Sequence, residues 1–515
     1  MGLKRYTASA DTTIVNAFKP NLRTRATGAN AGMADVLEVY SIYGRETTAS
    51  QELSRILINF PVTTITADRT AGTIPSSGSV SFYLRMFNAP HSKTVPRDFK
   101  LDIVAVSQSW EEGVGLDLET YKDDTKGNTG ANWMSASSTA RWKSVGGDYV
   151  AETISNVYSQ TLTDGLEDLL VDITTLVENW ITGSDGSQFD NYGVGVRLSS
   201  SYEAHFSYSA GTDSGSVVQN TDGATKSYFT KRFFARGSQY FFKRPVIEAR
   251  WDSTVKDARG DFYYSSSLAP AADNLNTVYL YNYIRGSLTN IPGVGTGEIL
   301  VSLYSGSATN TAPDGPGSSS KVEFYDGNTN ITGGYKSTGI YTASLAITAG
   351  TTPLTKLFDV WHSGSTEYFT GSIVPKQFEA AQAVSKPTYY MNITNLRGKY
   401  RKDETARFNL YIRNKNWSPT IYTVANSNPE GTTVVSASYR VYRVLDGYEA
   451  VRYGTGSDIH TQLSYDVSGN YFDFDMKLLE PSYAYAFKFA FYDSALVSWV
   501  EQPYAFKFRV EDYEY

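Results

Sequence analysis

Six runs of alternating side chains near the C-terminus restrict the fold of this chain more than any other feature of its sequence. In each run, apolar or aromatic residues alternate with polar ones, which is the pattern of a strand with one buried face. The runs cover residues 389–398, 405–414, 436–447, 470–479, 483–493 and 504–512. Because strands spaced so regularly pair through short turns, we expect residues 385–515 to form an immunoglobulin-like β-sandwich. The chain contains no cysteine, so aromatic packing has to replace a disulfide between the sheets.

Strand-like runs separated by Gly, Ser, Pro and Asn also fill most of the remaining sequence. The chain has 515 residues, which is too long for one core, and it contains 39 Tyr and 25 Phe, which favour pleated surfaces. We therefore predict an all-β protein of tandem β-sandwich domains. The expected domains are an N-terminal jelly roll over 1–258, a middle β domain over 259–384 and the C-terminal sandwich over 385–515.

Residues 172–183 in the N-terminal domain show the spacing of a helix instead of a strand. Asp172 precedes it as a cap and Gly183 follows it as a stop signal. Its apolar residues recur at helical spacing and share one face: Ile173, Leu176, Val177, Trp180 and Ile181. A tryptophan on such a face either packs into a core or lines a ligand site, and core packing is the favoured interpretation.

Short motifs in the first 258 residues occur in a fixed order. They are SADTTIVNAF (9–18), SRILINFPV (54–62), SQSWEEGVG (107–115), GANW (130–133), DITTLVENWITG (172–183) with DNYG (190–193), and RFFARGSQYFFKRPVIEARW (232–251). In this order they resemble the DNRLRE-type jelly-roll domains, a family related to carbohydrate-binding modules. The sequence departs from that pattern at Gly237 and through a long insertion at 200–227.

The resemblance implies structural roles for several motif residues. In such jelly rolls a short helix closes one end of the sandwich, so Trp180 would pack inward. Asn191, Tyr192 and Gly193 would turn the chain into the next strand, and Trp110 would mark a strand end.

The charge balance and the polarity of the chain exclude several classes of partner. The formal net charge is -7 with a pI near 5.4, which opposes a surface that tracks nucleic-acid phosphates. No run of 18 apolar residues and no signal peptide are present, so we expect no membrane partner and synthesis in a host cytoplasm.

The sequence shows no catalytic constellation. The four histidines are too dispersed for a metal site or a triad, and we expect them at the surface or in loops. A glycosidase needs two carboxylates in a cleft. The candidates follow Trp110 in the sequence: Glu111, Glu112, Asp117, Glu119, Asp123 and Asp124. No cofactor is expected, but a structural calcium ion stays open as an alternative, held by the acidic residues of 117–124 or by the YDGNTN turn (325–330).

Two functions therefore compete. The Cys-free, acidic, Tyr- and Gly-rich tandem β domains resemble a tailed-phage virion protein of the tail, neck or baseplate, present in several symmetric copies among other virion proteins. The alternative is a receptor or adhesion protein that binds host-surface glycan through its N-terminal domain. That alternative predicts an exposed aromatic cluster of Tyr121, Trp133 and Trp142.

Overall fold

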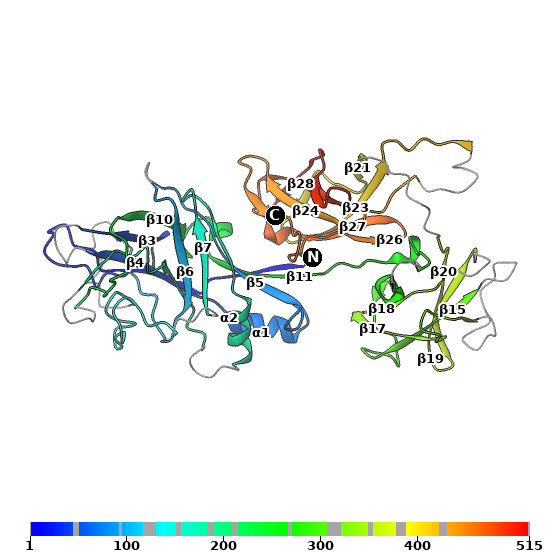
Figure 1. Cartoon of the computed structure of the whole chain (residues 1–515), viewed down its shortest axis with the longest axis horizontal. Coiled ribbons are helices and arrows are strands. Elements are labelled where there is room, and N and C mark those ends of the chain that lie inside the picture. The colour runs from blue at the N-terminus through cyan, green and yellow to red at the C-terminus, as the bar shows by residue number, and fades with distance from the viewer. Residues whose placement is uncertain are drawn as a thin grey trace. The chain divides into compact units, whose positions relative to one another are not determined.

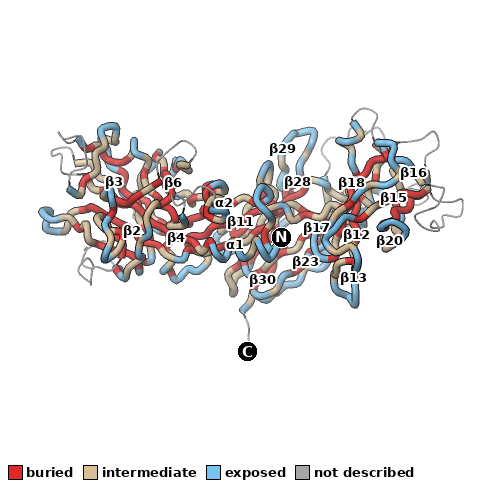
Figure 2. Tube along the Cα trace, turned by 90° about the horizontal axis from the view of Figure 1, so that it is seen from below, coloured by how far each residue is buried: buried red, intermediate tan, exposed pale blue. Residues whose placement is uncertain are grey.

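The computed structural model describes residues 2–44, 51–91, 95–116, 130–150, 156–183, 190–207, 215–265, 270–305, 321–348, 354–376, 388–421 and 430–512. Their contacts divide the chain into two compact units, Gly2–Asp252 and Ser253–Tyr515. In each unit the buried residues follow the strands, while the connections between them are mostly exposed (Figure 2). The predicted all-β class is confirmed, and every unit is built of tandem β-sheets.

The first unit is a sandwich of two antiparallel sheets. One has the order β1-β11-β5-β8, and the other has the order β10-β3-β4-β9-β6-β7 with β2 paired to β4. The strands are β1 (Leu3–Thr7), β2 (Ala10–Val15), β3 (Val36–Ile42), β4 (Glu52–Asn59), β5 (Val80–Met86), β6 (Phe99–Ala105), β7 (Val157–Leu162), β8 (Leu169–Asp172), β9 (Val194–Leu198), β10 (Tyr228–Phe234) and β11 (Val246–Trp251). The first and last strands of the unit pair with each other, so both ends of this segment are fixed in one sheet.

Two helices lie next to each other at one end of the first unit (Figure 1). The predicted helix is α2 (Thr174–Thr182), which ends at Gly183 in a left-handed conformation. Asp172 stands one position further from the helix than a cap residue, and its carboxylate accepts bonds from Thr174 N and Oγ1. The other helix, α1 (Val62–Thr70), is absent from the sequence-based expectation.

Helix α1 shows where the sequence-based expectation is wrong. The sequence pattern predicts a strand up to residue 62 and a loop after it, because all of the first five residues of the helix are β-branched residues of low helix propensity. Tertiary contacts form the helix: the guanidinium of Arg69 makes two hydrogen bonds of 2.6 and 2.7 Å to the carboxylate of Glu178 on α2. A short 3-10 helix, η3 (Phe241–Lys243), completes the unit.

The first part of the second unit contains one bent sheet of the order β12-β18-β17-β15-β19-β20, with β16 paired to β15. Its strands are β12 (Asn276–Tyr281), β15 (Ile299–Ser305), β16 (Lys321–Val322), β17 (Ile331–Ser337), β18 (Ile340–Leu345), β19 (Leu357–Ser363) and β20 (Thr366–Ile373), beside the hairpin β13 (Tyr283–Ile284) and β14 (Ser287–Leu288). Strand β17 pairs with β15 at its start and with β18 at its end, so the sheet folds over a core that includes Trp361 and Tyr341.

The C-terminal part is a sandwich of two sheets, of the orders β21-β23-β27-β26 and β22-β30-β28-β24-β25, with β29 paired to β28. Its strands are β21 (Tyr389–Ile393), β22 (Lys399–Arg401), β23 (Thr405–Asn414), β24 (Ala437–Arg443), β25 (Glu449–Val451), β26 (Ser464–Asp466), β27 (Gly469–Asp475), β28 (Ala484–Asp493), β29 (Ser498–Glu501) and β30 (Phe506–Glu511). All six predicted runs contain a strand, so this prediction is confirmed.

Aromatic rings fill the space between these two sheets, as the absence of cysteine requires. Phe408 and Phe472 of one sheet face Tyr439, Phe487 and Phe508 of the other, and all five are buried. The ring centroids of Phe408 and Phe487 are 4.8 Å apart, and those of Tyr439 and Phe472 are 4.4 Å apart. Contacts between rings at such distances add to the stability gained from burial.

The first predicted domain boundary, after residue 258, falls a few residues beyond the division at 252/253. Residues just past this division pair within the second unit, because Asp257 N donates to Tyr465 O over 3.0 Å. Arg259 of the 3-10 helix η4 (Ala258–Gly260) then pairs with the buried Asp359 of β19. Two further 3-10 turns are η5 (Ala271–Asp273) and η6 (Met476–Leu478). The boundary at 384/385 stays a prediction, since both of its sides belong to one compact unit.

Candidate functional site

The two described tryptophans of the expected glycan-binding cluster are buried. Trp133 is 0% exposed and Trp142 is 6% exposed, and they pack with Leu57 and Ile14 in a second core of the first unit. Their indole N–H groups donate to backbone carbonyls, Trp133 to Ser216 O and Trp142 to Asn132 O, each over 2.8 Å. The prediction of an exposed platform is therefore wrong for both residues. Tyr121 lies outside the described residues.

The buried side chain of Arg55 connects β4 both to Glu203 and to residues 130–150. Arg55 of β4 donates to both carboxylate oxygens of Glu203 over 2.9 and 2.8 Å, and to Gly146 O over 3.1 Å. Its guanidinium also lies 5.4 Å from the ring centroid of Trp133 and 5.8 Å from that of Tyr149. Burial raises the pKa of the Tyr149 hydroxyl, which donates to Gly146 O. These contacts hold residues 130–150 against the sheet and keep Trp133 inaccessible to a ligand at the surface.

Three motifs of the family resemblance meet at a second charged cluster. The guanidinium of Arg236 donates to both oxygens of Glu112 over 2.9 and 2.6 Å, and Asp11 N donates to Glu112 over 2.9 Å. The carboxylate of Asp11 accepts from Arg236 N, while its Oδ1 is buried without a partner among the described residues.

This cluster brings two carboxylates together but does not form a catalytic pair. Burial raises the pKa of Asp11 to about 7, with the bond from Arg236 N acting against this rise and the nearby charge of Glu112 contributing to it. Asp11 is 0% exposed, so a substrate cannot reach it, and Glu112 is held by Arg236. The carboxylate of the other candidate acid, Glu111, accepts a long bond of 3.4 Å from Ser138 N.

The predicted motif residues Trp110, Asn191, Tyr192 and Gly193 form one structural junction. Asn191 Nδ2 donates to Phe60 O and Trp110 Nε1 donates to Tyr192 O, each over 2.8 Å. Gly193 has a φ of +82°, and a Cβ at this position would lie 2.0 Å from Ile58 O. The junction ties the end of β4 to the start of β9, so these residues serve the fold.

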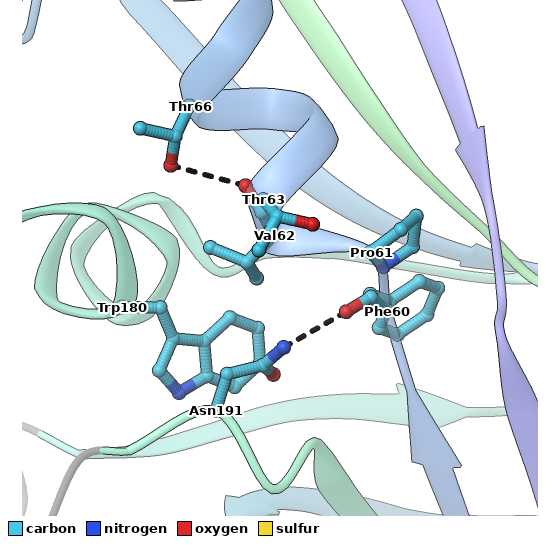
Figure 3. Close-up of a pocket in the computed structure, with 7 residues that line it drawn as sticks. All are labelled: Phe60, Pro61, Val62, Thr63, Thr66, Trp180 and Asn191. Carbon is cyan, nitrogen blue, oxygen red and sulfur yellow. Dashed lines mark hydrogen bonds between the residues drawn. The ribbon is translucent and has the colours of Figure 1, made fainter.

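A pocket of about 400 Å³ lies beside this junction, between the first turn of α1 and the indole of Trp180 (Figure 3). Seven residues line it: Phe60, Pro61, Val62, Thr63, Thr66, Trp180 and Asn191. In Figure 3 the side chain of Val62 points from α1 toward Trp180, and Asn191 reaches up to Phe60. Trp180 is 8% exposed and belongs to the main core, so the prediction that it packs inward is confirmed. Trp180 also forms one wall of the pocket, so it both packs into the core and lines a pocket.

Two polar atoms on the lining side chains have no hydrogen-bond partner among the described residues. They are the Nε1–H donor of Trp180 and the Oδ1 acceptor of Asn191, and both are buried. A buried polar atom without a partner costs about 1–3 kcal/mol, so such atoms are uncommon outside sites that take up water or a ligand.

Comparison with known proteins adds little to this geometry. No family model and no curated protein matches the chain. Among solved structures it is similar to the tandem Ig repeats of Dlar at 10% identity and a TM-score of 0.13, covering 41% of this chain and 82% of that one. The N-terminal Ig1-2 module of the Drosophila receptor protein tyrosine phosphatase DLAR gives 9% identity, a TM-score of 0.14, and coverage of 46% and 90%. Salmonella alpha-2-macroglobulin reacted with methylamine gives 8% identity, a TM-score of 0.14, and coverage of 98% of this chain and 26% of that one.

The candidate ligands of a metal ion are engaged in other contacts. The carboxylate of Asp326 accepts from the backbone and side chain of Asn328, and Asn330 Oδ1 accepts from Lys321 Nζ, whose positive charge opposes a cation. Within the described ranges no three acidic, His or Cys side chains form a metal-binding group. The acidic segment 117–124 lies outside the described residues.

The prediction that each histidine lies at the surface or in a loop is wrong for His362, which is buried in strand β19 with its ring hydrogen-bonded to Ser302 Oγ. His460 is buried too, but it lies in a turn, where its ring is hydrogen-bonded to the carboxylate of Asp458. None of the described helices is long and apolar enough to span a bilayer.

The sequence analysis missed the residues that α1 contributes to the pocket. One signal was present: Pro61 precedes Val62, and proline is common where a helix begins because it has no N–H to leave unbonded. Val62 and Ile65 then follow at helical spacing and are both buried.

Proposed function

We propose that this chain is a non-enzymatic structural component of a tailed-phage virion, part of a tail, neck or baseplate fibre or bracket, and that it acts through protein–protein interfaces. The virion assignment rests on the sequence, on its tandem Tyr- and Gly-rich β domains without cysteine. The role in an assembly has separate support from one surface of the C-terminal sandwich.

That surface is the hairpin patch, which consists of Tyr492, Leu496, Val497, Trp499 and Val500 on the β28–β29 hairpin. The exposed fractions of Leu496 and Val497 at its tip are 49% and 74%, and the hairpin is drawn as exposed in Figure 2. Aromatic and aliphatic side chains grouped on an otherwise polar surface are typical of a protein interface.

The hairpin holds this patch in a defined shape. The carboxylate of Asp493 accepts bonds from Ala495 N and Leu496 N over 2.9 and 3.2 Å, which orders the turn. The rings of Tyr492 and Trp499 meet edge to face with centroids 5.7 Å apart. An ordered apolar tip loses little conformational entropy on docking, which favours a role as an interface.

The proposal is tested by mass spectrometry of density-banded phage particles from the cells that encode the chain. We expect the chain in a fixed ratio to the other virion proteins. Its absence from the particles would overturn the structural role.

A variant pair tests whether the hairpin patch makes the contact. Val497→Asp places a charge at the patch, whereas Leu445→Asp places one on the β24–β25 hairpin, where Leu445 is 79% exposed. Both variants should fold, and only Val497→Asp should be lost from the particles. Equal incorporation of the two variants would show that the assembly contact lies elsewhere.

The second candidate function is glycan binding by the first unit. It no longer has the support of Trp133 and Trp142, but the pocket beside Trp180 favours it.

A further inference from the structure

The first unit contains a lysine whose side chain is completely enclosed by the protein. Lys231 of β10 is 0% exposed. Its Nζ contacts three oxygens, which are Asn88 Oδ1 at 2.6 Å, Glu167 O at 2.8 Å and Gly165 O at 3.0 Å. A lysine is almost never fully buried unless a carboxylate pairs with it, and none of these three oxygens belongs to a carboxylate.

We propose that Lys231 and Asn88 are joined by an isopeptide bond, an amide between the lysine amine and the side-chain carbonyl of the asparagine. The amine and the carboxamide are already in contact, and neighbouring groups hold both of them. Asn88 N donates to the carboxylate of Asp168 over 2.9 Å, and Nζ of Lys231 lies 4.8 Å from the ring centroid of Phe233. This modification goes beyond the proposed role in a virion and does not depend on it.

The reaction needs no oxidant, reductant or cofactor. Nζ of Lys231 attacks Cγ of Asn88, the bond between Cγ and Nδ2 breaks, and Nδ2 leaves as ammonia. One proton of the neutral amine moves to the leaving nitrogen, so atoms and charges balance. Fixed contact between the two groups replaces a slow encounter in solution, which is a large part of the barrier to such a reaction. Asn88 is only half-buried, so the ammonia has a way out to solvent.

The ring of His91 is placed to polarise the carboxamide. His91 Nε2 lies 2.7 Å from Asn88 Oδ1. This Oδ1 atom is a carbonyl oxygen that can only accept, so the imidazole donates its N–H to it. Negative charge develops on the same oxygen when the amine attacks, and a donor already in place stabilises that charge. Burial lowers the pKa of His91 to about 4, so the ring is neutral near pH 7.

The amine has to lose its proton before it can attack. Burial lowers the pKa of Lys231 to about 8, against the opposing charges of Asp168 and Glu167. A part of the amine is therefore neutral near pH 7, whereas an exposed lysine, with a pKa of about 10.4, is almost entirely protonated there.

The bond connects the two sheets of the first sandwich. Lys231 lies on β10 of one sheet, and Asn88 follows β5 of the other sheet. The backbone already pairs at this place, because Ala89 N donates to Arg232 O over 3.1 Å. In a chain without cysteine, an isopeptide bond provides the covalent link between sheets that a disulfide otherwise provides.

Mass spectrometry of the denatured full chain tests the proposal. We expect the mass of the wild-type chain to be lower than its sequence requires by one molecule of ammonia. We also expect a proteolytic digest to contain a branched peptide that joins residue 88 to residue 231. Both results are read from the wild-type chain, so the test stands even if a variant fails to fold.

A matched pair of lysine variants shows which amine reacts. Lys231→Met keeps a long side chain without the amine, and Lys226→Met removes an exposed lysine shortly before the same strand. We expect Lys231→Met to have the full mass of its sequence and Lys226→Met to keep the loss of ammonia. Asn88→Ala should also have its full mass.

A time course tests the part played by His91. The chain is made by cell-free synthesis, and the fraction of branched peptide is followed from the end of synthesis in the wild-type chain and in His91→Phe. We expect His91→Phe to form the bond roughly 100-fold more slowly, because the donor to the carboxamide oxygen is lost. Equal rates would remove His91 from the reaction.

Two outcomes would overturn the isopeptide bond. One is a wild-type chain of full mass whose digest contains no branched peptide. The other is a loss of ammonia that persists in Lys231→Met, because an asparagine that closes into a cyclic imide loses ammonia without any lysine. The virion role is tested on particles and is independent of both outcomes.

Discussion

Arg55 and Glu203 form a bidentate ion pair in which the two side chains are only 4% and 6% exposed. The pair joins β4 to a segment 148 positions later in the sequence. It also fixes Gly146 and Trp133, so one arginine organises the second core of the first unit.

Removing one partner of this pair should therefore be costly. We expect Glu203→Gln and Arg55→Met each to destabilise the first unit by about 3–5 kcal/mol, because each leaves a buried group without its partner. The double variant Arg55→Met with Glu203→Met should recover much of this loss. Thermal unfolding of the three variants checks the prediction, and it is contradicted if the two single losses simply add in the double variant.

The stability of the first unit should also fall as the pH rises toward the pKa of Asp11. Burial raises this pKa to about 7, above the value of about 4 in an unfolded chain. The folded state therefore holds its proton more tightly, and the stabilisation is complete below pH 4 and is lost as the pH rises through 7.

Asp11→Asn removes this titration and keeps an uncharged side chain beside Glu112. We expect its melting temperature to be less dependent on pH than that of the wild-type chain between about pH 5 and 8. If the melting temperatures of the two proteins changed with pH in the same way over that range, the assignment to Asp11 would be contradicted.

Two glycines with a left-handed backbone allow the cost of conformational strain to be measured apart from the cost of steric overlap. Gly183 has a φ of +60° with open space where a side chain would stand, whereas a Cβ on Gly193 would overlap Ile58 O. We expect Gly183→Ala to cost about 1–2 kcal/mol. Gly193→Ala should cost clearly more in chemical denaturation, and equal losses would contradict the role of the junction in the fold.

The C-terminal sandwich should depend on its aromatic core. Phe487 is 0% exposed and contacts rings of both sheets, so Phe487→Ala should cost about 3–5 kcal/mol by leaving a cavity. Tyr492→Ala on the same strand is the control, because Tyr492 is 40% exposed and its loss should have a small effect. Differential scanning calorimetry measures both, and a tolerated Phe487→Ala would contradict the packing argument.

The elements that the sequence predicts correctly are those whose pattern lies within a few neighbouring residues. Alternation over a few positions was enough to locate β23, β27 and β28, since each side chain of a strand faces away from its neighbour. Helix α2 was found for the same reason, from the spacing of Leu176, Val177 and Trp180. The junction residues Asn191, Tyr192 and Gly193 were found through the order of short motifs.

Which surfaces are covered, and where a pocket remains, depends on contacts between residues that are distant in the sequence. Trp133 is buried where Arg55, which is distant in sequence, lies near its ring and bonds to Gly146 O, and Trp142 packs into the same core. Helix α1 forms against α2 although its own residues favour a helix weakly. Contacts between residues this distant depend on how the whole sheet is assembled, and no local pattern of residues encodes them.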